Sequence, residues 1–260
     1  MMDKKPTLAD YHAWLATELK CDTRNIRAYY QAVTSKAKND LENGSFWVEL
    51  NRQIREFDDQ YLVQTGFPLQ MNAKPLEVLV KPFDSFFLKT FRKNIAENRN
   101  WPDHPDKGWL NPNACFEKIN DVLRTLLVIK YLDGIQFFAD KLKSFCDEQK
   151  VDCRVYLEAR NDGYYAAHTY VKQAFEIPKA TWDTEIIDIT IEIQATTQLQ
   201  DAIRKLLHKY YEERRGRIEK EDKKWQWNHG SDEFAANYLG HILHYVEGMI
   251  VEIREKQKRG

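Results

Sequence analysis

The spacing of apolar residues predicts helices at both ends of the chain and strands in its middle. Apolar residues recur every three or four positions between residues 8 and 65, which is typical of helices with one packing face. The clearest stretch of this spacing is Trp47, Leu50, Ile54, Phe57 and Tyr61. Another helix is predicted over residues 82–98, because Pro82 suits a first helical turn and Asp84 suits the positive end of the helix dipole.

The middle of the chain changes between strand and helix patterns. Residues 122–131 form an apolar, β-branched run typical of a buried strand, and residues 134–149 return to helical spacing. Shorter strands are predicted at 152–158 and 170–177. The strand 187–194 alternates most regularly, with Ile187, Ile189, Ile191 and Ile193 on one face and Asp188, Thr190, Glu192 and Gln194 on the other.

Two further helices are predicted to close the chain. The first, over residues 197–224, is strongly charged, and the second begins at an N-cap near Ser231. The second helix carries one apolar stripe: Phe234, Tyr238, Ile242, Val246, Met249 and Ile253. Helices, a β-α-β-β-β core and helices again predict an α+β fold with a mixed β-sheet.

Charge and composition exclude some classes of protein. Lys and Arg together number 39 against 40 Asp and Glu, so the formal net charge of -1 excludes a protein that holds nucleic acid by bulk charge. No stretch approaches the roughly 20 apolar residues of a membrane-spanning helix, and the N-terminus lacks an apolar targeting segment. We therefore expect a cytoplasmic protein with neither membrane nor DNA as a partner, and with its four scattered cysteines reduced.

Three segments carry polar side chains that packing alone does not require. Asp121 precedes the buried strand, a position that suits a metal ligand, but taken alone a turn residue is the favoured interpretation. For the polar face of strand 187–194 taken alone, a solvated sheet face is the favoured explanation. Asp162-Gly163 is typical of a hairpin turn, which leaves Tyr164 and His168 without an explanation.

In this order the segments resemble the synthetase domain of the RelA/SpoT family, the (p)ppGpp synthetases. The resemblance covers about residues 78–215 and depends on several short motifs in the family's order. The motifs are KPFDSFFLK at 81–89 followed by Arg92 and Lys93, DVLRTL at 121–126, GYYAAH at 163–168, EIQ at 192–194 and HKYY at 208–211. The resemblance implies a nucleotidyltransferase-like mixed-sheet core, with residues 1–77 as an N-terminal helical extension and 216–260 as C-terminal helices packing on the core.

The resemblance also implies an activity. Such an enzyme moves the β,γ-pyrophosphate of ATP to a ribose 3′-hydroxyl, with GDP or GTP as the acceptor and (p)ppGpp, the alarmone of the stringent response, as the product. The first alternative is a toxin that pyrophosphorylates the 3′ CCA end of tRNA to block translation and is neutralised by an antitoxin protein. The second alternative is a degenerate, non-catalytic module that binds a nucleotide.

Site residues follow from the resemblance. It implies that Asp121 and Glu192 are the catalytic carboxylates and the Mg²⁺ ligands, which agrees with the preference of Mg²⁺ for oxygen. The implied ATP-binding residues are Lys81, Ser85, Lys89, Arg92, Lys93 and Arg124, and the basic members of 81–93 fall largely on one side of a helix. The implied acceptor-binding residues are Tyr164, His168, Gln194 and His208.

The chain departs from the family pattern at two motifs. The family's D-x-x-G-x-R has Arg124 in place of the glycine and Leu126 in place of the arginine. Because positions two apart on a strand face the same side, Arg124 partly replaces the missing guanidinium. Thr196 stands where the family usually has a second arginine. With only helical residues before the core, a single-domain small alarmone synthetase, or a toxin of that lineage, is the better comparison.

The C-terminal segments leave interpretations of their own. Basic and acidic residues alternate along 197–224, and a solvated helix face with i,i+4 ion pairs is preferred over a phosphate-binding patch. Trp225 and Trp227 follow, and we interpret them as core anchors rather than base-stacking groups. His241 and His244 share a helix face and are interpreted as packed histidines rather than zinc ligands.

Overall fold

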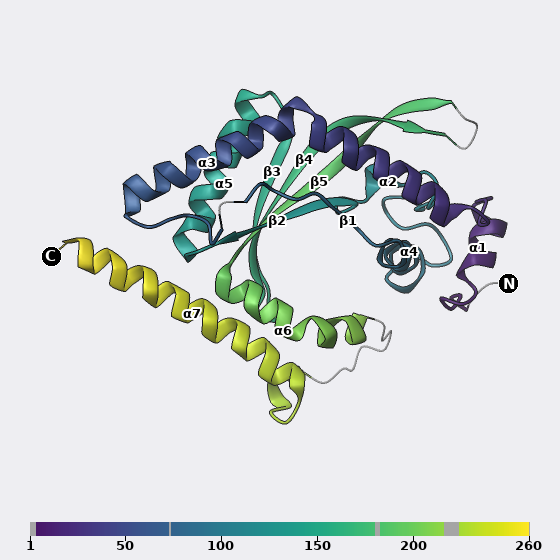
Figure 1. The fold of residues 1–260 in the computed structure, drawn as a ribbon. Coiled ribbons are helices and arrows are strands. Elements are labelled where there is room, and N and C mark those ends of the chain that lie inside the picture. The colour runs from purple at the N-terminus through teal and green to yellow at the C-terminus, as the bar shows by residue number, and fades with distance from the viewer. Residues whose placement is uncertain (1–3, 73, 180–182, 216–223, 260) are drawn as a thin grey trace. The chain divides into compact units, whose positions relative to one another are not determined.

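The computed structural model describes residues 4–72, 74–179, 183–215 and 224–259, with the side chains of 207–215 and 259 outside the description (Figure 1). The chain divides into two compact units, each made of separate stretches of sequence. Unit 1 comprises Met1–Val48, Val78–Thr125 and Val171–Glu192. Unit 2 comprises Glu49–Glu77, Leu126–Tyr170 and Ile193–Gly260.

Five strands form one sheet in the order β1-β2-β5-β4-β3. The strands are β1 (Leu79–Val80), β2 (Leu123–Ile129), β3 (Cys153–Ala159), β4 (Tyr165–Pro178) and β5 (Thr184–Thr197). β1 pairs antiparallel with β2, with Leu79 opposite Arg124. The predicted α+β class with a mixed sheet and helices at both ends is confirmed. The two-residue strand β1 was not predicted, because two residues between turns carry no periodicity.

Unit 1 is built around an aromatic cluster on its first helices. Its helices are α1 (Tyr11–Glu18), α2 (Ile26–Asn43) and α4 (Phe83–Phe91), and α4 continues as a π-helical turn over Arg92–Ala96. One group of buried side chains joins α1 to α4: Tyr11, Trp14, Leu15, Cys21, Ile26, Phe87, Phe91 and Ile95. The hydroxyl of Tyr30, on α2, donates a 2.6 Å hydrogen bond to the carbonyl of Lys81. This bond ties α2 to the chain between β1 and α4.

Unit 2 contains the remaining long helices. These are α3 (Ser45–Thr65, whose first turn belongs to unit 1), α5 (Leu132–Glu148), α6 (Gln198–Arg215) and α7 (Asp232–Arg259). α7 contacts both α5 and α6. Near its C-terminal end, Arg254 is buried and pairs with Asp133 of α5 while its guanidinium also bonds the hydroxyl of Tyr61 on α3. The predicted N-cap is confirmed, since the Ser231 hydroxyl accepts the backbone N–H of Phe234 at 3.1 Å.

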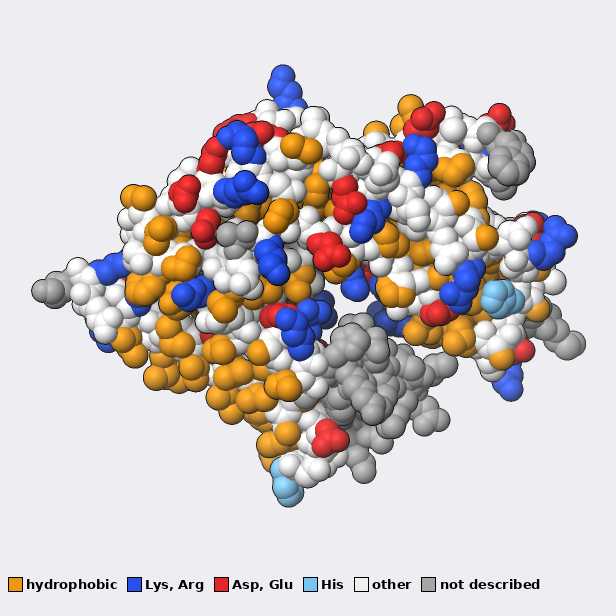
Figure 2. Space-filling model, in the orientation of Figure 1, with side chains coloured by type: hydrophobic (Ala, Val, Ile, Leu, Met, Phe, Trp, Pro, Cys, Tyr) orange, Lys and Arg blue, Asp and Glu red, His pale blue; other side chains and the backbone are white. Residues whose placement is uncertain are grey.

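The apolar stripe of α7 is largely exposed, with Ile242 at 55% and Ile253 at 54% of their accessible surface (Figure 2). The buried face of α7 consists instead of small and polar residues: Ala236, Asn237, Gly240, Glu247 and Arg254. Hydrophobic periodicity identifies a stripe but not its direction, and here a close backbone contact at Gly240 decides which face turns inward.

Candidate functional site

Two residues predicted to bind ATP and one predicted catalytic carboxylate meet in unit 1. Lys81 directly follows β1, and its backbone N–H bonds the carbonyl of Val122 at 2.9 Å, which brings it beside the start of β2. Asp121 accepts the ammonium of Lys81 at 2.8 Å on one oxygen and that of Lys89, from α4, at 2.9 Å on the other. The three side chains are largely buried. We call Lys81, Asp121 and Lys89 the lysine–aspartate triad.

Burial and charge act against each other in this triad. Burial by itself raises the pKa of Asp121, but the attraction of Lys81 and Lys89 is stronger in sum, and the pKa ends below its ordinary value. Burial lowers the pKa of Lys81, and Asp121 restores only part of the loss. The triad therefore holds an ionised carboxylate between two ammonium groups and carries a surplus of one positive charge.

The other residues predicted for the ATP site lie outside the triad. Arg92 and Lys93 both pair with Glu97, at 2.8 Å for the Arg92 Nε and for the Lys93 Nζ. The chain changes from α-helical to π-helical geometry at Arg92. Arg92 and Lys93 therefore do not lie on the same helix face as Lys89, as they would in a continuous α-helix. Ser85 is exposed on α4, and Arg124 is half-buried on β2.

The second predicted carboxylate lies on the neighbouring strand of the sheet. Glu192 is on β5, next to β2, and its side chain is buried. Among the described residues no group of three or more His, Cys, Asp or Glu side chains is placed to hold a metal ion. Mg²⁺ at phosphate sites ordinarily takes several of its ligands from the substrate and from water, with one or two protein carboxylates.

Three predicted acceptor residues meet in unit 2. The hydroxyl of Tyr164 lies 3.0 Å from Nε2 of His168, and the side-chain amide of Gln194 donates to the same hydroxyl. Tyr164 precedes β4, His168 lies within it and Gln194 lies on the adjacent strand β5. His168 is buried. The network fixes the hydroxyl end of the tyrosine and leaves its ring half-exposed.

Two residues of this network were missed from the sequence. The guanidinium of Arg160 lies 4.7 Å from the ring centroid of Tyr164 and pairs with Glu158. The same Glu158 carboxylate lies 3.8 Å from Nε2 of His168. Hairpin register would have identified both, because Arg160 and Tyr164 flank the turn and are joined by a 3.0 Å backbone hydrogen bond.

The glycine of the predicted turn packs directly on α7. Gly163 has φ of +79°, a conformation that side chains rarely adopt. A Cβ at Gly163 would overlap the carbonyl of Asn237, and a Cβ at Gly240 would overlap the carbonyl of Gly163. The loop that carries Tyr164 therefore touches α7 backbone to backbone.

Two histidines of α7 complete this contact. Nε2 of His241 lies 3.0 Å from the Asn161 carbonyl, so it donates there, and Nδ1 accepts the hydroxyl of Tyr165 at 2.8 Å. His244 stacks on the ring of Tyr165 at 3.6 Å between centroids, and burial lowers its pKa. The interpretation of both as packed histidines is confirmed.

The fold was compared with known proteins. No family model matches the sequence, and no curated protein matches it in sequence either. The structure resembles the small alarmone synthetase 1 from Bacillus subtilis at a TM-score of 0.55 and 14% identity, over 91% of this chain and 100% of that one. The chain has the fold of a small alarmone synthetase.

Ligand-bound structures of the Bacillus subtilis synthetase match as well. The structure with its product pppGpp gives a TM-score of 0.52 at 14% identity, over 86% of this chain and 94% of that one. The structure with AMPCPP gives 0.51 at 16% identity, over 82% of this chain and 92% of that one. In the part of the small alarmone synthetase fold that is described for this chain, no helix is long and apolar enough to cross a membrane.

The predictions for residues 197–227 can be compared with the structure only in part. The side chain of His208 lies outside the described residues, as do those of Lys209, Tyr210 and Tyr211. In the described first turns of α6, Arg204 and Lys205 both pair with Asp201, as in the preferred interpretation of a solvated helix. Trp225 packs on Tyr238, as expected of an anchor, whereas the anchor interpretation of Trp227 is wrong, because it is 84% exposed.

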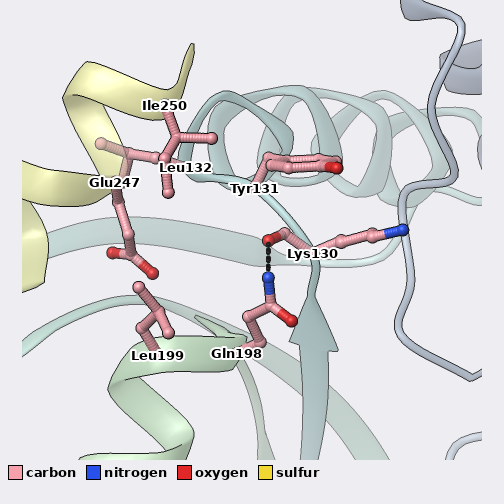
Figure 3. Close-up of a pocket in the computed structure, with 7 residues that line it drawn as sticks. All are labelled: Lys130, Tyr131, Leu132, Gln198, Leu199, Glu247 and Ile250. Atoms are coloured by element: carbon pink, nitrogen blue, oxygen red, sulfur yellow. Dashed lines mark hydrogen bonds between the residues drawn. The ribbon is translucent and has the colours of Figure 1, made fainter. Parts of the chain in front are cut away.

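A small cavity in unit 2 lies between α7 and the start of α6. Figure 3 shows the residues that line it: Lys130, Tyr131, Leu132, Gln198, Leu199, Glu247 and Ile250. Its free volume suits about one water molecule, so it excludes a nucleotide. Glu247 is 4% exposed, and its carboxylate oxygens have no hydrogen-bond partner of ordinary geometry. Burial raises the pKa of Glu247 to about 7, against a smaller opposing effect of Thr197 and the Leu199 backbone.

Proposed function

We propose that the protein is an ATP-dependent pyrophosphokinase that transfers the β,γ-pyrophosphate of ATP to a ribose 3′-hydroxyl of GDP or GTP. The observation that carries the proposal is the lysine–aspartate triad in a small alarmone synthetase fold. Two ammonium groups held on one carboxylate are a structural ion pair in most proteins, but here they lie at the residues where the family resemblance expects ATP. A triphosphate is the substrate that uses both cations at once.

The triad supplies the donor side of the reaction. The phosphates of ATP compete with Asp121 for the ammonium groups of Lys81 and Lys89, because they carry more charge than one carboxylate. When Lys81 and Lys89 bind the phosphates instead, both oxygens of Asp121 become available. Asp121, together with Glu192 on the adjacent strand, would then hold a Mg²⁺ ion. Such an ion would neutralise charge on the transferring group. Glu192 in addition accepts the proton of the attacking hydroxyl.

The network around Tyr164 supplies the acceptor side. Its ring is rigid because His168 and Gln194 hold the hydroxyl, and a rigid ring loses little entropy when a purine stacks on it. Arg160 lies against the same ring and is held by Glu158. We expect its guanidinium to exchange Glu158 for a phosphate of the acceptor when the purine binds.

Transfer of label from γ-³²P ATP tests the activity and the acceptor together. The protein is incubated with Mg²⁺, labelled ATP and one of GDP, GTP, ADP or tRNA with a 3′ CCA end, and products are separated by chromatography and gel electrophoresis. We expect label on GDP or GTP. Label on tRNA instead assigns the toxin activity, for which an antitoxin is the expected partner. ATP binding without transfer to any acceptor contradicts the proposal and leaves a nucleotide-binding module.

Matched variants connect the activity to the named carboxylates. Asp121→Asn and Glu192→Gln should each lower the transfer rate by a factor of about 100 or more, as for a residue that stabilises transition-state charge. Asp84→Asn is the control, because Asp84 is an exposed carboxylate at the start of α4 that pairs with Arg27. Transfer that persists unchanged in both site variants, or that falls equally in the control, contradicts the assignment.

A further inference from the structure

Two of the four cysteines meet where helix α5 ends and strand β3 begins. Cys146 lies in the last turn of α5 and is fully buried, and Cys153 is the first residue of β3 and is 6% exposed. The thiol of Cys146 donates a hydrogen bond to the sulfur of Cys153. Both residues are free cysteines. We call Cys146 and Cys153 the α5–β3 thiol pair.

The backbone between α5 and β3 holds the two thiols together. Lys150 has φ of +57°, the left-handed conformation that commonly ends a helix, and its N–H bonds the carbonyl of Asp147 at 3.1 Å. The N–H of Val151 bonds the carbonyl of Cys146 itself at 2.9 Å. The chain therefore returns past Cys146 only two residues before it reaches Cys153. Because the backbone already brings the pair together, a bond between the two sulfurs requires mainly side-chain rotation.

The surroundings distinguish the two thiols. The hydrogen bond from Cys146 and the charge of Lys143 lower the pKa of Cys153, although burial and two nearby carboxylates oppose them. The same hydrogen bond, together with burial, raises the pKa of Cys146. Cys153 is also the more exposed of the two. The thiolate, and with it the first reaction with an oxidant, therefore belongs to Cys153.

We propose that the α5–β3 thiol pair is a modification site at which hydrogen peroxide closes a disulfide that locks the end of α5 to the start of β3. The Cys153 thiolate attacks one oxygen of the peroxide, the O–O bond breaks, and the second oxygen leaves as water after taking up a proton. The sulfur of Cys146 then attacks the resulting sulfenic acid, loses its proton and expels the remaining oxygen as a second water. Two thiols lose two electrons and two protons in sum, and the peroxide takes up both.

The position of the pair sets what the disulfide does. Only six residues separate Cys146 from Cys153, so the closed loop is short and restricts the unfolded chain modestly. We expect the Tm to rise by about 5 °C. Glu158, which belongs to the network around Tyr164, lies five residues further along β3, about 17 Å from the pair in an extended strand. The disulfide therefore stabilises unit 2 without contacting that network.

Peptide mapping of the full chain tests the modification. The reduced protein is treated with hydrogen peroxide under native conditions, remaining thiols are alkylated after denaturation, and the chain is cut with trypsin. Trypsin cuts once between the two cysteines, after Lys150, so the disulfide joins peptide 144–150 to peptide 151–154. We expect this linked peptide after peroxide and its release by dithiothreitol.

Cys21 is a control for exposure within the same chain. It is 5% exposed, nearly as much as Cys153, but its sulfur accepts the side-chain amide of Asn113 at 3.4 Å, and burial raises its pKa. We expect Cys21 to remain a thiol at the peroxide concentration that links the pair. Unlinked peptides after peroxide, equal oxidation of Cys21, or a disulfide between two chains overturns the proposal.

Single variants test the order of the two steps and the effect on stability. Dimedone, which labels sulfenic acids, should label Cys153 in Cys146→Ala at least about tenfold more than it labels Cys146 in Cys153→Ala. The reverse preference overturns the assignment of Cys153. Thermal unfolding followed by circular dichroism should show the rise in Tm after peroxide in the wild type and none in Cys146→Ala. A wild type that becomes linked without a rise in Tm overturns the lock, and the spectra before oxidation show that each variant is folded.

Discussion

Replacing Glu247 with glutamine should change how the stability of the protein depends on pH. Glu247 is almost fully buried beside Leu199 and Ile250, and Figure 3 shows the ammonium of Lys130 directed away from it. No cation of the cavity lining therefore compensates its charge. Burial raises the pKa of Glu247 from 4.5 in the free side chain to about 7 in the folded protein.

The size and sign of the effect follow from these two pKa values. Between them the folded state keeps a proton that the unfolded state has released, so the free energy of unfolding falls as the pH rises through this window. A difference of about 2.5 pKa units corresponds to about 3 kcal/mol at most, all of it present below pH 4.5 and lost above pH 7. Glutamine cannot ionise, so the variant lacks this loss.

Urea unfolding at several pH values between 5 and 8.5 measures the effect. The difference between variant and wild type should grow in favour of Glu247→Gln by roughly 1–3 kcal/mol across the range, while other titrating groups cancel in the subtraction. Glu255→Gln is the control, because Glu255 is half-exposed on the same helix and pairs with Lys258 at 3.4 Å. Parallel profiles for wild type and Glu247→Gln would refute the reasoning, since the buried carboxyl would then titrate normally.

Three further predictions concern the α7 contact and the donor side of the proposed reaction. Gly240→Ala should destabilise the protein by about 1–3 kcal/mol in urea unfolding, because its Cβ overlaps the loop backbone, whereas Gly248→Ala, which meets nothing within 4 Å, should be neutral or stabilising. Lys89→Met should raise the KM for ATP about tenfold or more while Lys93→Met, whose lysine pairs with Glu97, changes it little; equal effects contradict the triad assignment. Calorimetric titration should detect Mg²⁺ binding only with a non-hydrolysable ATP analogue present, because both oxygens of Asp121 are otherwise bonded to lysine; equal binding without nucleotide contradicts this order.

Local periodicity was enough to predict most of the elements and part of the site. The alternating isoleucines gave β5, and the apolar run gave β2, because both patterns are set by burial along a single strand. Lys81, Lys89 and Asp121 were expected to share a site and do meet, although they come from three different segments. This shared site was predicted from the order of the motifs along the chain and from the family resemblance, because no single motif indicates it.

Features decided by contacts between distant segments could not be predicted. The direction of the α7 stripe depends on Gly163 and Gly240, which are far apart in the sequence. Arg160 and Glu158 are a different case, because assigning the local hairpin register would have placed them beside Tyr164 and His168. For the α7 stripe the deciding quantity is a distance across the fold, which composition and periodicity do not contain.

The backbone contact between Gly163 and Gly240 also limits how this part of the chain can vary. Each missing Cβ is excluded by the opposing main chain rather than by a side chain, so no pair of compensating substitutions can relieve the overlap. A substitution or exchange in the turn at residues 160–164 therefore has to fit the α7 turn at 237–241 as it stands, and the reverse holds as well. In a chimera with a small alarmone synthetase, exchanging either segment alone should give insoluble protein, and exchanging both together should restore a folded one.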